Sequence, residues 1–365
     1  MKFQTDKASL LKGVQAVQSI VSTKNIIPII SNILLDAKKE RLTLTTADID
    51  IGIAIQSFIT VTTQDEGSIT VPAKKFFEII KELPNAPVSI NVKKNNMVII
   101  DCEKCQFKLL GVPKDEFPKI PDFSKKEYLT TDQGKLKNML KLTSFAMSRD
   151  ETRYILNSVL FDIKNDKLRV VSTDGRRLAT IEEDIAAPKT FNRQFIVPSK
   201  TIQELNRVLS EEGDIKIILG ESQMAFELDN TLITSRLIDG EFPNYEQVIP
   251  KEEKQKLKTN REALIAAIKR MSLYTTQESL CVRFDIFKDK LVLSKNTQDL
   301  GEAREEIDIA YGGKELTIGF NPAFILDAVK ELAQDEVVFE VTDSEKPAVL
   351  REKRYVYIIL PMHIA

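Results

Sequence analysis

The sequence predicts an α+β protein made of three tandem copies of one domain, each with two helices and two antiparallel sheets. Two observations support this prediction. The same order of strands and helices appears three times along the chain. The copies are spaced by about 125 residues, which is the length of a whole domain and far longer than a solenoid repeat. The length of 365 residues also suits two or three domains better than a single core.

Each copy begins with a short strand, then an Asp or Asn able to cap a helix, then an amphipathic helix. A hairpin follows, and then a second strand and helix, with a proline where that helix begins. The opening segments are residues 2–11, 128–136 and 256–264. The hairpins are residues 32–48, 157–174 and 282–294, and the second strand–helix units are residues 68–80, 194–205 and 316–329. A β-α-β-β-β order therefore occurs twice in each copy.

The domain boundaries are expected in polar, lysine-rich stretches near residues 125 and 253. This gives three domains, at residues 1–125, 126–253 and 254–365. No apolar run approaches the length of a membrane span, and residues 1–6 lack the apolar stretch of a signal peptide. We therefore expect a cytoplasmic protein.

The first helix of each copy is more basic than the rest of the chain. Residues 7–24, 133–149 and 257–273 have net charges of +3, +4 and +3, whereas the whole chain has −2. In the first of these helices Leu10, Val14, Val17 and Val21 make the expected buried stripe, and Lys12, Gln15 and Ser19 lie opposite. Such helices would attract phosphates on one surface, although a solvated helix face is the simpler interpretation for any one of them. The absence of Trp argues against a base-stacking channel for single strands.

No catalytic or metal-binding motif is evident. The Cys102–Cys105 pair has the spacing of half a zinc site, but no second pair exists and the only histidine is His363. We expect instead that Glu103 and Lys104 form the turn of a hairpin. The chain has no phosphate-binding loop. We expect no cofactor, no metal and no catalytic residues.

Five segments resemble one family, the β subunit of bacterial DNA polymerase III, which is the sliding clamp. They are residues 153–157 (Arg-Tyr-Ile-Leu-Asn), 173–179 (Thr-Asp-Gly-Arg-Arg-Leu-Ala), 239–245 (Asp-Gly-Glu-Phe-Pro-Asn-Tyr), 319–321 (Gly-Phe-Asn) and 358–362 (Ile-Ile-Leu-Pro-Met). The resemblance extends from Met1 to Ala365. It implies that the three copies are DNA-clamp domains of a non-catalytic processivity factor, which closes as a head-to-tail homodimeric ring around duplex DNA and tethers polymerases.

The resemblance also implies three sets of site residues. A peptide-binding pocket would be formed by Leu156, Thr173, Gly175, Arg177, Leu178, Pro243, Val248, Asn321, Phe324, Pro347, Ile359, Leu360, Pro361 and Met362. The expected DNA contacts, including the lysines of the basic helices, are Lys12, Lys24, Lys137, Lys141, Arg149, Tyr154, Lys200 and Lys269. The dimer interface would include Lys75, Phe107, Leu109, Leu273, Glu302 and Glu305.

The implied partners are double-stranded DNA, a second copy of the chain, the α subunit of DNA polymerase III, the clamp loader δ subunit and other proteins with a motif like Gln-Leu-x-Leu-Phe. A membrane is not among them. Two other hypotheses compete with the clamp. One is an α+β enzyme in which acids such as Glu302, Glu305 and Glu306 hold magnesium. The other is a monomeric repeat scaffold that binds proteins and no DNA.

Overall fold

A computed structural model describes residues 1–21, 28–123, 126–185, 192–250, 255–298 and 300–364. The predicted repeat is present, because each copy follows the order β-α-β-β-β and then β-α-β-β-β, with one additional strand, β5, in the first copy. The predicted site residue Lys24 and the predicted boundaries at residues 125 and 253 lie outside the described residues.

The elements of each copy have the following bounds. The first copy contains β1 (Lys2–Asp6), α1 (Lys7–Val17), η1 (Gln18–Ile20), η2 (Pro28–Ser31), β2 (Asn32–Lys38), β3 (Arg41–Asp48), β4 (Ile53–Thr60), β5 (Thr62–Asp65), β6 (Gly67–Pro72), α2 (Ala73–Glu82), β7 (Pro87–Val92), β8 (Met97–Cys102), β9 (Cys105–Leu110) and η3 (Lys114–Glu116). The second contains β10 (Tyr128–Asp132), α3 (Gln133–Thr143), η4 (Ser144–Ala146), β11 (Ser158–Lys164), β12 (Lys167–Thr173), β13 (Arg177–Asp184), β14 (Asn192–Pro198), α4 (Ser199–Val208), β15 (Asp214–Leu219), β16 (Gln223–Leu228), β17 (Thr231–Arg236) and η5 (Tyr245–Gln247). The third contains β18 (Gln255–Asn260), α5 (Arg261–Ser272), β19 (Val282–Ile286), β20 (Lys290–Thr297), β21 (Gly301–Tyr311), β22 (Leu316–Phe320), α6 (Pro322–Val329), β23 (Glu336–Val341), β24 (Ala348–Glu352) and β25 (Tyr355–Ile359).

The sheets extend across the copies, which the sequence did not predict. The described strands form a 5-stranded sheet (β5-β1-β7-β8-β9), an 8-stranded sheet (β10-β15-β16-β17-β4-β3-β2-β6) and a 12-stranded sheet (β14-β11-β12-β13-β25-β24-β23-β18-β21-β20-β19-β22). The last strand of the second copy pairs with β4 of the first, and the last strand of the third pairs with β13 of the second. This pairing satisfies backbone groups that would otherwise form exposed sheet edges.

The chain divides into two compact units. The first contains residues 1–134 and 203–237, and it holds the 5-stranded and 8-stranded sheets. The second contains residues 135–202 and 238–365, and it holds the 12-stranded sheet. The second copy therefore contributes one half to each unit.

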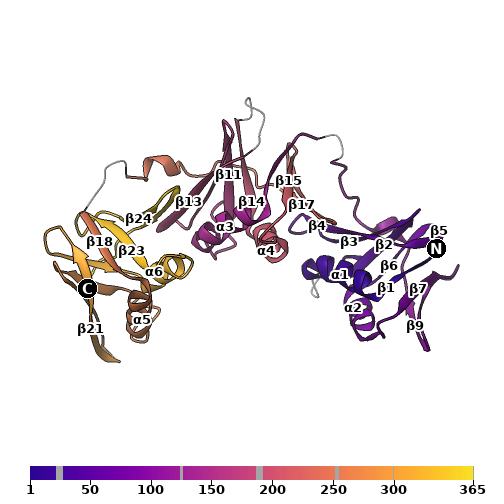
Figure 1. Cartoon of the computed structure of the whole chain (residues 1–365), viewed down its shortest axis with the longest axis horizontal. Helices are drawn as coiled ribbons and strands as arrows, with labels where there is room; N and C mark the ends of the chain where they lie inside the picture. Colours follow the sequence, from indigo (N-terminus) through magenta and orange to yellow (C-terminus); the bar gives the residue numbers. More distant parts are fainter. Residues whose placement is uncertain (22–27, 124–125, 186–191, 251–254, 299, 365) are drawn as a thin grey trace. The chain divides into compact units, whose positions relative to one another are not determined.

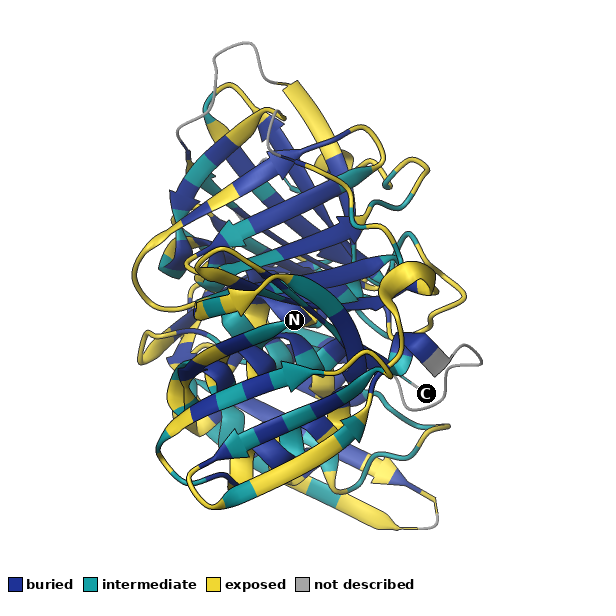
Figure 2. Ribbon diagram, turned by 90° about the vertical axis from the view of Figure 1, so that its right-hand side faces the viewer, coloured by how far each residue is buried: buried dark blue, intermediate teal, exposed yellow. Residues whose placement is uncertain are grey.

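The first helix of a copy packs on a sheet through the stripe that the sequence predicted. Leu10, Val14 and Val17 of α1 are fully buried and Lys12 is exposed, but Val21 is only half-buried because the chain leaves the helical path after η1. In the first unit α1 lies on β3 and β4 and beside α2, and in the second unit α5 lies on β20 and β21 and beside α6 (Figure 1). Figure 2 shows buried and exposed residues alternating along many of the strands, as expected for sheets with one covered face.

Local signals in the sequence also have the expected structure. Asp6 caps α1 by accepting a hydrogen bond from the backbone N–H of Ser9 at 2.8 Å. Cys102 and Cys105 face each other across the predicted two-residue turn, where Glu103 has a φ of 51°. Among the described residues, no helix has both the length and the apolar character needed to cross a membrane.

Candidate functional site

A tight turn between β12 and β13 organises the first group of predicted pocket residues. The Thr173 hydroxyl donates to the carbonyl oxygen of Arg177 at 2.5 Å and accepts from the backbone N–H of Gly175 at 3.0 Å. Gly175 has a φ of +90°, a conformation that L side chains rarely adopt. The turn therefore fixes the end of β12, where Thr173 pairs with Leu178 of β13, and places Gly175 between the two strands.

Arg177 lies in the interior at this turn, with its residue only 5% exposed. Its Nε donates to Asp174 at 3.0 Å, its Nη1 to Asp327 at 2.9 Å, and its Nη2 to the carbonyl oxygen of Phe145 at 2.7 Å. The guanidinium carbon lies 4.5 Å from the centre of the Phe324 ring. Because these bonds point inward, Arg177 positions Phe324 and the end of α6 more than it offers donors to a ligand.

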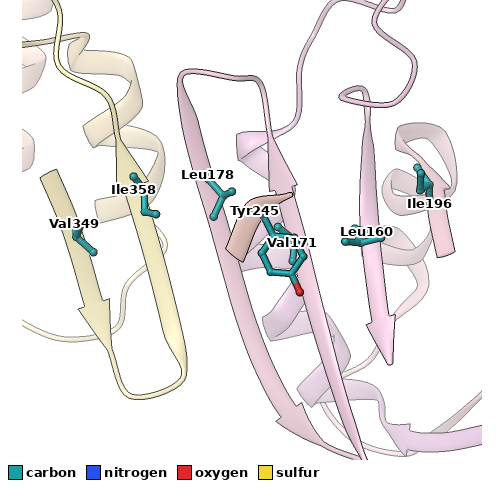
Figure 3. Packing of buried hydrophobic residues seen from close by; sticks show 7 residues of the cluster. All are labelled: Leu160, Val171, Leu178, Ile196, Tyr245, Val349 and Ile358. Carbon is teal, nitrogen blue, oxygen red and sulfur yellow. The ribbon is translucent and has the colours of Figure 1, made fainter. Parts of the chain in front are cut away.

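An apolar cluster lies next to the turn between β12 and β13. Leu178, Val171 and Ile358 pack with Tyr245 of η5, and Figure 3 shows the Tyr245 ring in front of Val171, between Leu178 and Leu160. This cluster joins β12, β13 and β25 to the loop that carries the predicted residues Pro243 and Val248.

A buried polar contact fixes the same loop. The Tyr245 hydroxyl donates to the buried carboxylate of Asp162 at 2.6 Å and accepts from Arg169 at 3.4 Å. Burial, followed by the hydrogen bond to Asp162, raises the pKa of Tyr245 well above its usual value. The hydroxyl therefore remains protonated and able to donate at physiological pH.

The C-terminal segment completes the arrangement. Ile359 pairs with Arg177, and the backbone N–H of Leu360 donates to the carbonyl oxygen of Arg176 at 2.9 Å. Met362 donates to the carbonyl oxygen of Gly319 at 2.8 Å, and a Cβ at Gly319 would lie 2.6 Å from the Met362 oxygen. Glycine at position 319 therefore permits the close approach of the terminal segment to β22.

The predicted pocket residues fall into two groups by exposure. Those at least partly exposed, and thus able to meet a ligand, are Leu156, Gly175, Pro243, Val248, Phe324, Pro347, Leu360, Pro361 and Met362. Those buried behind them are Thr173, Arg177, Leu178, Asn321 and Ile359. The exposed group is mainly apolar, as expected for a site that binds a short peptide.

Three residues that support this group were not predicted as site residues. Asp327 and Phe145 hold Arg177, and Asp162 holds Tyr245. Asp162 is itself buried, and an isolated buried acid next to an apolar strand was the signal that could have identified it.

The predicted DNA contacts have different surroundings. Lys12, Arg149 and Lys269 are exposed and Tyr154 is 58% exposed, whereas Lys137 and Lys200 are half-buried. Lys141 lies 3.6 Å from Glu331. Arg270 of α5 forms a bidentate ion pair with Glu305, so the third basic helix has less unpaired positive charge than its sequence suggested.

Two strands retain unpaired edges where the predicted interface residues lie. Among the described strands β9 pairs only with β8, and Phe107 on it is 39% exposed. The first eight residues of β21, 301–308, pair with β20 but not with β18, which reaches only residues 309–311. Leu273, which follows α5, is 76% exposed.

Two of the three acids proposed as an alternative magnesium site, Glu305 and Glu306, are used in ion pairs. Glu305 binds Arg270, and Glu306 binds Arg304 and Lys290. Within the described ranges, no group of three or more His, Cys, Asp or Glu side chains is arranged to hold a metal ion.

Comparisons with known proteins match the chain along nearly its whole length. Models of the N-terminal, central and C-terminal domains of the DNA polymerase III beta subunit match residues 1–121, 130–244 and 246–363. The beta sliding clamp of Chlamydia pneumoniae is 33% identical over 365 residues, covering 100% of this chain and 99% of that protein. The beta sliding clamp of Pseudomonas aeruginosa is 31% identical, with 100% of both chains covered.

Solved structures give the same result for the fold. The DNA polymerase sliding clamp of Bacillus subtilis has a TM-score of 0.95 at 31% identity, with both chains fully covered. A sliding clamp of Pseudomonas aeruginosa bound to griselimycin has a TM-score of 0.94 at 31% identity, again with both chains fully covered.

Proposed function

The chain belongs to the DNA polymerase III beta subunit family, the bacterial sliding clamps, and we propose that two copies close head to tail around duplex DNA. The protein is a non-catalytic processivity subunit that tethers replicative and repair polymerases to DNA. The observation that carries this proposal is that three domain models of one family match the three copies in order. We expect it in the bacterial cytoplasm, where the chromosome is replicated.

Weak and replaceable phosphate contacts are what this function requires. A closed ring is tethered by its topology, so tight binding to DNA is unnecessary and would oppose sliding. Exposed lysines such as Lys12 and Lys269 on the first helices can contact phosphates without reading bases. We propose that Lys137, Lys141, Arg149, Tyr154 and Lys200 add further contacts, together with Lys24.

The pocket around β13 and the terminal segment would bind the partners. The exposed apolar side chains Val248, Leu360 and Met362 offer contacts for the apolar residues of a Gln-Leu-x-Leu-Phe peptide. The buried bonds of Arg177 and Tyr245 keep their supporting elements in place before the peptide arrives, which reduces the entropy lost on binding. The α subunit of DNA polymerase III and the clamp loader δ subunit are the expected partners.

The unpaired edges of β9 and β21 would form the dimer interface, and the repeat predicts their register. Within the chain, Thr231 of β17 pairs with Ser57 of β4, and Tyr355 of β25 pairs with Ile181 of β13. Thr231 and Tyr355 are each the first residue after a two-residue turn. Cys105 is the first residue after the equivalent turn before β9, so the three positions correspond. The same register places Cys105 opposite Glu305 of the partner subunit.

This register brings complementary side chains together. Lys108 lies opposite Glu302 of the partner subunit, and Leu110 opposite Leu300 of the partner subunit. Leu110 and Leu300 are 66% and 51% exposed in the single chain, so pairing would bury two apolar side chains. Pairing of the edge strand around Phe107 and Leu109 with residues 301–309 of the second chain is the contact that the resemblance implies, with Lys75 and Leu273 close to it.

Retention on circular DNA tests the proposed function. The protein is loaded by a clamp loader onto a nicked circle, and its release is measured before and after the circle is linearised at moderate salt. Retention on circles and rapid loss from linear DNA is the expected result. Equal release from both would mean that the basic helices bind by charge alone, and would favour the scaffold hypothesis.

A further inference from the structure

One acidic position is repeated in the second helix of all three copies. Glu78, Glu204 and Asp327 are each the sixth residue of their helix, in α2, α4 and α6. The side chains of Glu204 and Asp327 are only 6% and 16% exposed, whereas that of Glu78 is 45% exposed. A charged side chain is seldom buried without a specific partner, so the two buried members are the informative ones.

Glu204 joins its helix to the preceding copy. It accepts a hydrogen bond from the hydroxyl of Ser19, in η1, at 2.6 Å and another from Arg207 at 2.9 Å. Arg207 in turn donates to the carbonyl oxygen of Ala16, near the C-terminal end of α1, at 2.7 Å. The acid therefore holds a cation against the end of the first helix of the first copy.

Asp327 makes the corresponding junction between the third and second copies. It accepts from Arg177 at 2.9 Å, and Arg177 donates to the carbonyl oxygen of Phe145, in η4 just after α3, at 2.7 Å. In both junctions, then, the acid binds a cation. That cation also binds a main-chain carbonyl at the end of the first helix of the preceding copy. A cation is favoured there by the helix dipole and the unpaired carbonyl groups.

Glu78 also pairs with a cation, although Lys75 lies three residues before it on the helix whereas Arg207 lies three residues after Glu204. Its carboxylate accepts from Lys75 of the same helix at 2.6 Å, and the Lys75 side chain is 60% exposed. The ends of the first helices of the first and second copies already meet Glu204 and the Asp327–Arg177 pair within the chain, so the end of α5 from a second molecule is the one that can face Glu78. The proposed pairing of β9 with β21 of a second molecule would correspond to the observed pairs β17–β4 and β25–β13, and it would bring α5 of that molecule beside α2.

We propose that the Glu78–Lys75 pair binds the C-terminal end of α5 of the partner subunit, with Lys75 donating to a main-chain carbonyl among residues 270–273. Glu78 is a positioning residue, since it orients the Lys75 ammonium as Glu204 orients Arg207. The proposal rests on the proposed head-to-tail dimer and assigns that interface a polar contact of its own. Its occupant is a second copy of this chain.

The dimer dissociation constant, measured by sedimentation velocity over a range of concentrations, tests the role of Glu78. For Glu78→Gln we expect weakening of about tenfold for each interface, which corresponds to 1.4 kcal/mol, and about a hundredfold for a ring that contains the interface twice. Lys75→Met should weaken the dimer similarly, and the double variant should be little weaker than either single variant.

Matched controls separate this role from a general effect of charge. Glu82→Gln removes an exposed acid from the same helix and should leave the dimer constant within twofold. Glu204→Gln makes the same change at a junction inside the chain, and it should lower the melting temperature while leaving dimerisation unchanged.

Two failures remain distinguishable. If the unmodified protein is monomeric at every concentration, the proposed ring is wrong. If it dimerises and Glu78→Gln dissociates no more readily than Glu82→Gln, the ring stands and the proposed role of Glu78 is overturned.

Discussion

Replacing Asp327 by Asn should weaken both the fold and the peptide pocket, because this carboxylate holds Arg177. The change removes the charge but keeps the shape of the side chain. A hydrogen bond between charged groups contributes about 1.5–3 kcal/mol, and Arg177 keeps its bonds to Asp174 and Phe145. We therefore expect a loss of about 2 kcal/mol in the free energy of unfolding, which for a unit of this size lowers the melting temperature by about 4–8 °C.

Peptide affinity should fall in the same variant. The Arg177 guanidinium lies over the Phe324 ring at 4.5 Å, so a looser guanidinium leaves one wall of the pocket less well fixed. We expect about tenfold weaker binding of a labelled Gln-Leu-x-Leu-Phe peptide, measured by fluorescence polarisation. Asp335→Asn, an exposed change just beyond α6, is the control and should alter neither quantity.

The dependence on pH provides a second readout of the same bond. Burial alone would raise the pKa of Asp327, but hydrogen bonds from Arg177 and Lys330 lower it below the usual value of 3.8. A lowered pKa in the folded state means that the carboxylate stabilises the protein above pH 3.8, and that this contribution is lost as the pH falls through the folded value. Asp327→Asn should remove that part of the acid sensitivity. An unchanged melting temperature together with peptide affinity within twofold of the original would refute the reasoning.

Three further predictions concern the pocket and the DNA surface. Leu178→Ala combined with Met362→Ala should abolish peptide binding and leave the dimer intact in sedimentation; affinity within twofold of the original would show that the pocket is misplaced. Tyr245→Phe leaves Asp162 without its hydroxyl donor and should cost about 1–3 kcal/mol in chemical denaturation, and a loss below 0.5 kcal/mol would contradict this. Lys12→Ala should reduce the salt dependence of the DNA affinity of the free protein by about one phosphate contact, without changing dimerisation, whereas an unchanged salt slope would remove Lys12 from the DNA surface.

The local structure could be predicted from the sequence because its signals are short-range. The spacing of Leu10, Val14 and Val17 determined which face of α1 is buried, and Asp6 marked where the helix begins. The Glu103-Lys104 turn followed from the two strands on either side of it. Each of these depends on residues within a few positions of one another.

The sharing of sheets between copies could not be predicted in this way. Alternating apolar residues show which face of a strand is buried, but not which strand lies beside it, so β17 and β4 gave no sign that they pair. Arg177 presents the same difficulty, since its partner Asp327 is 150 positions away. The available sequence signal was that Asp327 and Glu204 occupy the same position in equivalent helices. This correspondence indicates a contact only when the partner of one of the two acids is already known.

The continuity of the sheets across the copies has a consequence for how a ring would open. At the junctions inside the chain, strand pairing is unimolecular, because the linking polypeptide keeps the two edges at a high effective concentration. Pairing of β9 with β21 of another molecule has no such tether, so the same hydrogen-bonding pattern becomes dependent on protein concentration. A covalent link between β9 and β21 of the partner subunit, such as a fused linker, would give that joint the permanence of the others, and linking both such joints would trap the ring in its closed state.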